Sequence, residues 1–124
     1  MAITTNTISV VQAPPEGDWK MASLYGANLT GGEDLVAAVA GKCIYVSKIY
    51  IANSASANQT VTIGGGEDVA TIYIGPIGMP DAGGSTTIDF GPDRAMKVAS
   101  GSQLSIDAEN AVGVSVLVWY KYAA

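Results

Sequence analysis

Histidine is absent from this sequence of 124 residues. Its absence removes the most common general base, the usual proton shuttle at neutral pH and the most common metal ligand. A serine nucleophile would need a lysine or carboxylate partner, and no spacing in the sequence identifies one. We therefore expect no enzymatic activity and no cofactor.

Charged residues are also scarce, at 14% of the chain against about 25% in an average soluble protein. A membrane segment or apolar surface buried against other protein chains would explain this. No run approaches the roughly 18 consecutive apolar residues of a spanning helix. The N-terminus, MAITTNTISVVQ, has neither the basic start nor the apolar centre of a signal peptide. We expect protein contact and no membrane partner.

Basic residues number only six against eleven acidic ones, and they are scattered singly along the sequence. No lysine or arginine stripe is available to neutralise phosphates, so we expect no nucleic-acid partner. The single cysteine, Cys43, cannot form an internal disulfide and lies in an apolar run. We expect it to be a small buried hydrophobe in a chain made in a reducing cytoplasm.

The acidic residues mostly flank glycines, as in Glu33-Asp34 and Glu67-Asp68. A glycosidase needs two carboxylates across a cleft, and a calcium site uses loop carboxylates and carbonyls. The spacing here matches neither pattern. We interpret these acids as turn formers and predict no catalytic or metal-binding residues.

The clearest pattern in the chain is a strand–turn–strand signal over residues 41–63. An apolar run over 43–53 precedes a small polar turn and an alternating Thr-Val-Thr-Ile run, which predicts a hairpin. Both parities of 43–53 are apolar, so that strand is either buried on both faces or changes face at a bulge. Residues 34–40 could form a short helix, but their alternation and the Gly41-Lys42 turn favour a hairpin with the next strand.

Counting from Leu35, about eight short strands recur every 8 to 12 residues with Gly/Pro turns between them. This pattern predicts an all-β protein, an antiparallel sandwich or barrel, and a jelly-roll-like β-sandwich is favoured over an immunoglobulin-like one. We expect one domain over residues 19–124. The expected strands cover 35–40, 43–53, 59–63, 69–74, 85–90, 95–99, 103–108 and 112–122.

Residues 1–18 have a different character. A β-leaning run over 8–11 is followed by Ala13-Pro14-Pro15, and two prolines force extended backbone without donors for a β ladder. We expect an extended N-terminal arm or an edge strand.

Aromatic residues lie on several of the expected strands, where they could cap the sandwich, form a subunit interface or provide a sugar-stacking platform. Residues 112–122 place a valine stripe on one face, which leaves Leu117 and Trp119 on the other. These two are the best candidates for intermolecular contact, since one face already has a core to fill. The predicted interface residues are Ile8, Val10, Val11, Trp19, Tyr45, Tyr50, Leu117 and Trp119.

The run LVAAVAGKCIYVSKIYIANSASANQTVTIGGG resembles small β-rich proteins of tailed-bacteriophage particles. The shared features are the AVAGK turn, the long strand ending in Asn-Ser-Ala and the Thr-Val-Thr-Ile return. The later runs Ile-Asp-Phe-Gly-Pro and Gly-Ser-Gln-Leu-Ser-Ile-Asp-Ala are similar too, so the likeness covers about residues 33–122. These proteins include capsid decoration (cement) proteins and head or tail fibre domains.

The resemblance implies a jelly-roll sandwich that forms homotrimers on the capsid exterior at three-fold positions, with an arm reaching to neighbours. The leading hypothesis is a capsid decoration protein, located in the virion, that clamps adjacent subunits of the major capsid protein. We expect residues 1–18 to become ordered only on the assembled shell. The alternative is a receptor- or carbohydrate-binding module of a phage tail fibre or head fibre.

Overall fold

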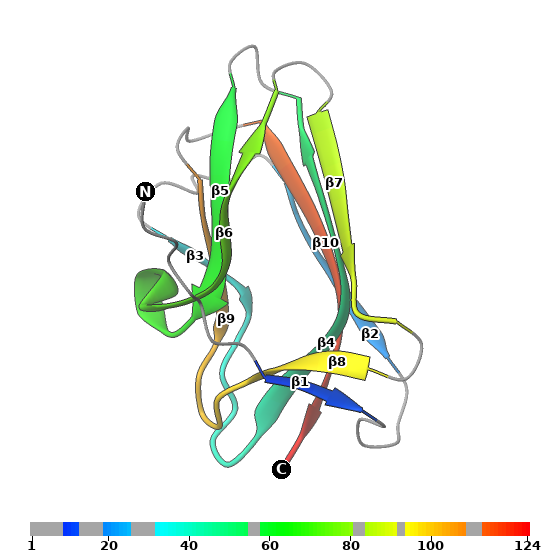
Figure 1. The fold of residues 1–124 in the computed structure, drawn as a ribbon. Coiled ribbons are helices and arrows are strands. Elements are labelled where there is room, and N and C mark those ends of the chain that lie inside the picture. Colours follow the sequence, from blue (N-terminus) through cyan, green and yellow to red (C-terminus); the bar gives the residue numbers. More distant parts are fainter. Residues whose placement is uncertain are drawn as a thin grey trace, which may run out of the picture.

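The chain folds into two antiparallel β-sheets that face each other across an apolar interior (Figure 1). A computed structural model describes residues 9–12, 19–25, 32–54, 58–80, 84–91, 94–108 and 113–124. We call the six-stranded sheet, of order β1-β8-β4-β10-β2 with β7 also paired to β4, sheet A. The four-stranded sheet, of order β3-β9-β5-β6, is sheet B.

The elements of both sheets follow in chain order. They are β1 (Ser9–Gln12), β2 (Lys20–Tyr25), β3 (Glu33–Val36), β4 (Cys43–Asn53), β5 (Gln59–Gly65), the short 3-10 helix η1 (Glu67–Val69), β6 (Thr71–Met79), β7 (Gly84–Asp89), β8 (Arg94–Val98), β9 (Leu104–Ala108) and β10 (Val114–Ala123).

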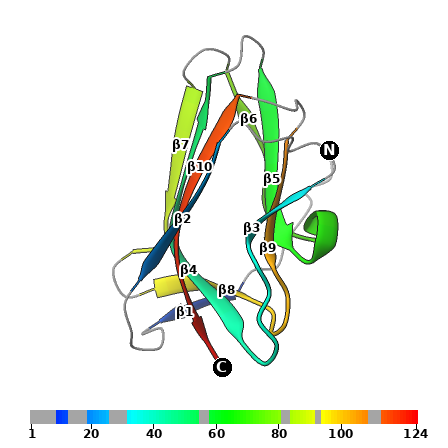
Figure 2. The same ribbon diagram turned by 180° about the vertical axis from the view of Figure 1, so that it is seen from behind.

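The strand order is that of a jelly roll, which confirms the predicted fold class. Without β1 and β8, sheet A reads β2-β10-β4-β7 and sheet B reads β3-β9-β5-β6. The first and last of these eight strands pair, and so do the second and the next to last, as in a jelly roll. The prediction included seven of these eight strands. It did not count β2, and it counted β8, which is an additional strand that pairs with β4 (Figure 2).

Both predicted hairpins are wrong. The turn at Gly41 forms, with the Lys42 N–H donating to the Val39 carbonyl at 3.1 Å, but β3 pairs with β9 and β4 pairs with β10. Likewise β4 and β5 belong to opposite sheets. A short turn after a strand can lead into the same sheet or across the sandwich, and local sequence does not distinguish the two.

A β-bulge explains why the β4 sequence is apolar at both parities. Trp119 is the partner of Lys48 and Tyr120 is the partner of Val46, so Ser47 is the extra residue on β4. The bulge changes which alternate residues of β4 face the core. Before the bulge these are the even-numbered Ile44 and Val46, and after it the odd-numbered Ile49 and Ile51. All four of these side chains are 0% exposed. The sequence left burial on both faces and a bulge as alternatives. The structure has the bulge, and Cys43 and Tyr45 on the other face before it are buried as well.

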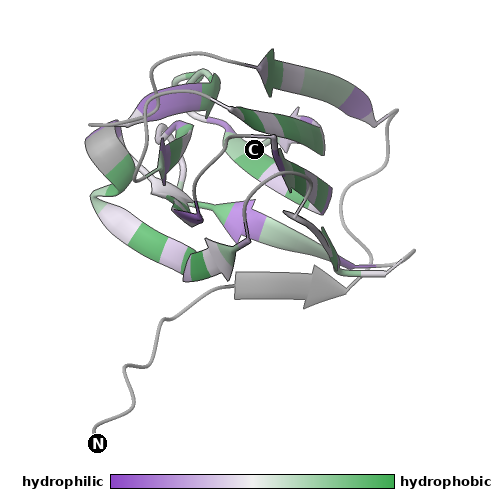
Figure 3. Ribbon diagram, turned by 90° about the horizontal axis from the view of Figure 1, so that it is seen from above, coloured by the Kyte–Doolittle hydropathy of each residue, from purple (hydrophilic) through white to green (hydrophobic). Residues whose placement is uncertain are grey.

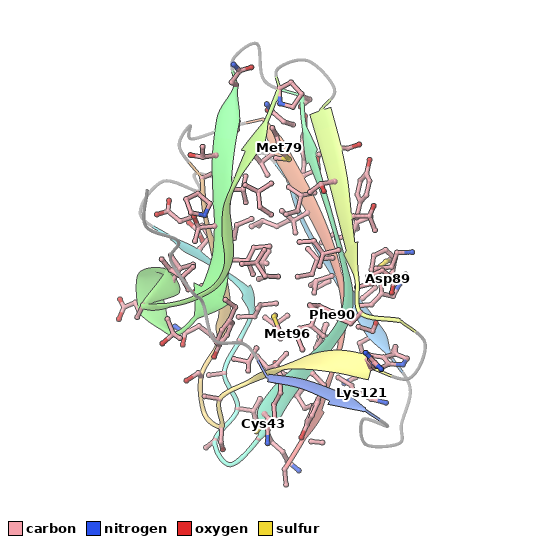
Figure 4. All side chains as sticks on the ribbon, viewed as in Figure 1. Cys43, Met79, Asp89, Phe90, Met96 and Lys121 are labelled. Atoms are coloured by element: carbon pink, nitrogen blue, oxygen red, sulfur yellow. The ribbon has the colours of Figure 1, made fainter. Side chains whose placement is uncertain are left out.

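The interior is lined from both sheets by apolar side chains, and Met79 and Met96 point into it from different sheets (Figure 4). Hydrophobic and hydrophilic residues alternate along the strands, as expected for strands with one buried face (Figure 3). A second, small cluster of Cys43, Tyr45 and Ala95 is buried on the opposite side of sheet A. Cys43 is therefore a buried hydrophobe, as predicted.

Tyr122 connects the two layers at one end of the sandwich, and its titration should make stability depend on pH. Its hydroxyl donates a hydrogen bond to the Ala37 carbonyl. Burial, and then the nearby Tyr120, raise the pKa of Tyr122 above the usual value of 10.0. Because the unfolded chain loses this proton first, the stabilisation is complete below the usual pKa and is lost as the pH rises through the folded pKa.

We expect the urea midpoint to fall as the pH rises above the usual tyrosine pKa of 10.0. Tyr122→Phe should make this alkaline fall less steep. Tyr25→Phe is the control, because the Tyr25 side chain is 72% exposed. An equally steep fall in the Tyr122→Phe protein would contradict the assignment.

Candidate interaction surface

The outer face of sheet A, turned away from sheet B, carries a group of large apolar side chains. The neighbours Val116 and Val118 are buried in the core, so Leu117 and Trp119 must project to the outer face. Leu117 is the partner of Tyr50 on β4, and Trp119 is flanked by Met21 on β2. We call Met21, Tyr25, Tyr50, Leu117 and Trp119 the aromatic face.

Members of the aromatic face are accessible to a partner. Met21 is 59% exposed and Tyr25 is 72% exposed, while Tyr50, Leu117 and Trp119 are partly exposed. Three predicted interface residues, Tyr50, Leu117 and Trp119, thus lie side by side on strands that pair along their length. Apolar surface of this kind, gathered on one face, is typical of a contact site.

The other predicted interface residues are placed differently. Trp19 lies just before β2 and packs against the small cluster that contains Tyr45. Tyr45 is only 5% exposed, so its side chain is occupied within its own chain and offers little area to a partner. Val10 and Val11 lie on β1, which pairs with β8 at the edge of sheet A. Ile8 lies outside the described residues.

Two members of the aromatic face, Met21 and Tyr25, were missed by the sequence analysis. They share the parity of Trp19 in the alternating run over 19–25. That alternation is the signal that could have identified them. It becomes informative only when β2 is known to pair with β10, which places Met21 beside Trp119 and Tyr25 beside Ser115.

A depression of about 380 Å³ lies beside the aromatic face, and we call it the tryptophan pocket. The Nζ of Lys48 lies 5.3 Å from the centre of the Trp119 ring, and the Nζ of Lys121 lies 4.1 Å from that of Trp19. A lysine ammonium thus covers one face of each indole, which leaves less ring surface for sugar stacking. The lining residues are Trp19, Ser47, Lys48, Asp89, Gly91 and Trp119.

Asp89 forms one rim of the tryptophan pocket and points away from sheet B (Figure 4). Its Oδ1 accepts the Gly91 N–H at 2.8 Å, which orients the carboxylate. Asp89 is also the partner of Lys48 across β7 and β4. The pocket therefore combines two aromatic rings with a lysine and an oriented carboxylate.

The outer face of sheet B is different in character. Thr60, Thr62, Asp107 and Ala108 line a shallow hollow of about 210 Å³ there. Among the residues that the structure describes, no group of three or more His, Cys, Asp or Glu could hold a metal ion. Within the same residues, no helix is long and apolar enough to cross a membrane.

No protein-family model and no curated protein matches this chain. In the cryo-EM structure of the virus-like particle of extra small virus (XSV) from the giant freshwater prawn Macrobrachium rosenbergii, a chain is similar to it with a TM-score of 0.50. The identity is 9%, over 98% of this chain and 82% of the other.

A chain of the acid-stable capsid of Helicobacter pylori bacteriophage KHP30 has a TM-score of 0.49 and 14% identity. That comparison covers 95% of this chain and 99% of the other. At 9% identity, the comparison with the XSV chain establishes a shared fold and no more.

Proposed function

We propose that this chain is a structural protein of a virus particle, and specifically a decoration protein on the outside of a phage head. In this role it clamps neighbouring subunits of the major capsid protein through the outer face of sheet A. The observation that carries the proposal is the aromatic face, which lies on a fold shared with a virus-particle protein.

The two outer faces of the sandwich differ in what they offer a partner. Aromatic residues and methionine are enriched at protein interfaces, and sheet A presents Met21, Tyr25 and Trp119. Sheet B presents threonines and Asp107, which suit solvent. The asymmetry supports attachment by sheet A with sheet B directed outward.

Attachment at several points explains how individually weak contacts could keep the protein bound to the capsid. A homotrimer on a fixed lattice presents three aromatic faces at once, and each bound subunit raises the effective concentration of the next. The N-terminal arm adds a further point of attachment. β1, the described part of residues 1–18, pairs with β8 at the edge of sheet A, the sheet that carries the aromatic face.

The test uses heads of the parent virus assembled without this chain. The purified protein should sediment with these heads and raise the temperature at which they release nucleic acid. Deleting residues 1–15 should leave a folded trimer, measured by light scattering, that no longer protects the heads against heat.

Three outcomes would contradict parts of this proposal. Failure of the full chain to bind heads would overturn the decoration role, and glycan-array binding in its place would favour a fibre module. Unchanged head binding and protection by the truncated chain would overturn the role of the arm. A monomer in solution and on heads would overturn the trimer.

A further inference from the structure

One edge of sheet A lacks the features that usually prevent strand edges from pairing with other chains. Among the residues that the structure describes, β2 pairs with β10 alone, and it is the last strand of its sheet. Edge strands are usually protected by prolines, bulges, charges or short length. β2 has six residues and no proline, and its register with β10 runs without a bulge. Its one charged residue, Lys20, lies at its first position.

The other edge strands of the described part of the chain are better protected. β3 has only four residues, of which Glu33 and Asp34 are acidic and exposed. β6 contains Pro76, and β7 ends with the exposed Asp89. β1 is as short as β3. The edge of β2 is therefore the one best suited to accept another strand.

The sequence of β2 is complementary to itself. Directly opposite residues of an antiparallel pair point to the same face of the sheet. If two copies of β2 pair with Ser23 on a two-fold axis, Met21 lies opposite the partner's Tyr25, and Ala22 lies opposite the partner's Leu24. Among the described residues, Met21 and Tyr25 are the two most exposed large apolar side chains, and this register packs each against the other. Contacts between methionine sulfur and an aromatic ring are favourable.

The same symmetry joins the two aromatic faces. Because opposite residues share a face, the two-fold axis of this pairing is perpendicular to the sheet. The outer faces of both copies of sheet A then point in the same direction. Trp119, the partner of Met21 within one chain, recurs on the other side of the contact. Pairing therefore enlarges the aromatic face and leaves it open to a third partner.

We propose that two copies of this chain pair through β2, which makes sheet A continuous across a two-fold axis. The pairing goes beyond the proposed function and holds for the protein in solution. A two-fold contact cannot close a ring of three, so on a shell it would join subunits of adjacent homotrimers. With the outer face of sheet A on the shell, the edge of β2 points sideways to such a neighbour.

The first test is a disulfide across the axis. Ser23→Cys should form a covalent dimer under mild oxidation, because opposite Cα atoms of antiparallel strands lie about 4.5–5.5 Å apart, within the range of a disulfide. Ser85→Cys is the control and should form none, since Ser85 is an exposed serine on β7, across sheet A from β2. Equal yields from the two variants, or no dimer from Ser23→Cys, would overturn the pairing.

The second test places a charge on the edge. Met21→Lys should have half the mass of the unaltered protein in sedimentation equilibrium at equal concentration, because lysine on an edge strand opposes pairing. Ile72→Lys, the same change at an exposed residue of β6, should keep the full mass. Equal masses of the two variants would overturn the pairing through β2.

Neither test needs heads, so their results are separate from those for the proposed function. A protein that pairs through β2 but does not bind heads would overturn only the decoration role. A protein that binds heads but gives neither the Ser23→Cys dimer nor the change in mass would overturn only the pairing.

Discussion

Replacing Ile49 with alanine is expected to lower the free energy of unfolding by about 2–5 kcal/mol, the usual cost of removing a buried aliphatic side chain. Ile49 is 0% exposed and lies in the middle of sheet A, as the partner of Val118 on β10 and of Ile88 on β7. Both sides of the strand are paired, so the surrounding backbone cannot collapse far into the cavity. Guanidinium unfolding followed by tryptophan fluorescence measures the loss.

The loss at Ile49 is large on the scale of the whole molecule, since domains of this size are stable by about 5–15 kcal/mol. Tyr50→Ala is the matched control, because the next residue of the same strand lies on the opposite face and is partly exposed. We expect it to cost clearly less stability. A larger loss for Tyr50→Ala than for Ile49→Ala would show that the facing assigned to β4 is wrong.

Replacing Trp119 with alanine is expected to weaken attachment to heads at least about 30-fold, which corresponds to about 2 kcal/mol or more per site. Tryptophan is among the residues that dominate binding energies at interfaces, and Trp119 joins the aromatic face to the tryptophan pocket. Its removal also releases Lys48 from the ring that holds it. Binding isotherms on heads, with circular dichroism to check the fold, measure the effect.

Ile72→Ala is the control for Trp119→Ala, since Ile72 is an exposed apolar residue, 42% accessible, on β6 of sheet B. It should attach as the unaltered protein does. If Ile72→Ala weakened attachment as much as Trp119→Ala, the contact would not be specific to sheet A. If neither variant changed attachment while the full chain bound, a surface other than the aromatic face would make the contact.

The sequence allowed several elements to be predicted closely. The run of alternating valines over 112–122 identified β10. The double-sided apolar run over 43–53 left two alternatives, burial on both faces or a bulge, and the structure has the bulge at Ser47. Leu117 and Trp119 were chosen because one face of their strand already had a core to fill, and they do lie on the outer face. These inferences succeed because side-chain direction alternates along a strand, so the pattern itself carries the facing.

Other features depended on contacts between distant parts of the chain. The expected hairpins of β3 with β4 and of β4 with β5 do not form, since the connections cross the sandwich. The placement of Lys97 and Lys121 on either side of Tyr45 was not apparent, because these distant residues are brought together only by strand pairing. Met21 and Tyr25 became candidates for the same reason.

The sequence by itself determined most of the strands, which of their faces are apolar and that the fold is all-β; it did not count β2, and it ended β6 at Gly75-Pro76 although that strand runs over Thr71–Met79. Those properties depend on local periodicity and turn residues. The tertiary structure alone decided which strands are neighbours, and with that the aromatic face and the tryptophan pocket. The physical reason is that backbone hydrogen bonds are the same for any pair of strands. Partner choice therefore comes from closing both apolar faces over one core, which no single segment encodes.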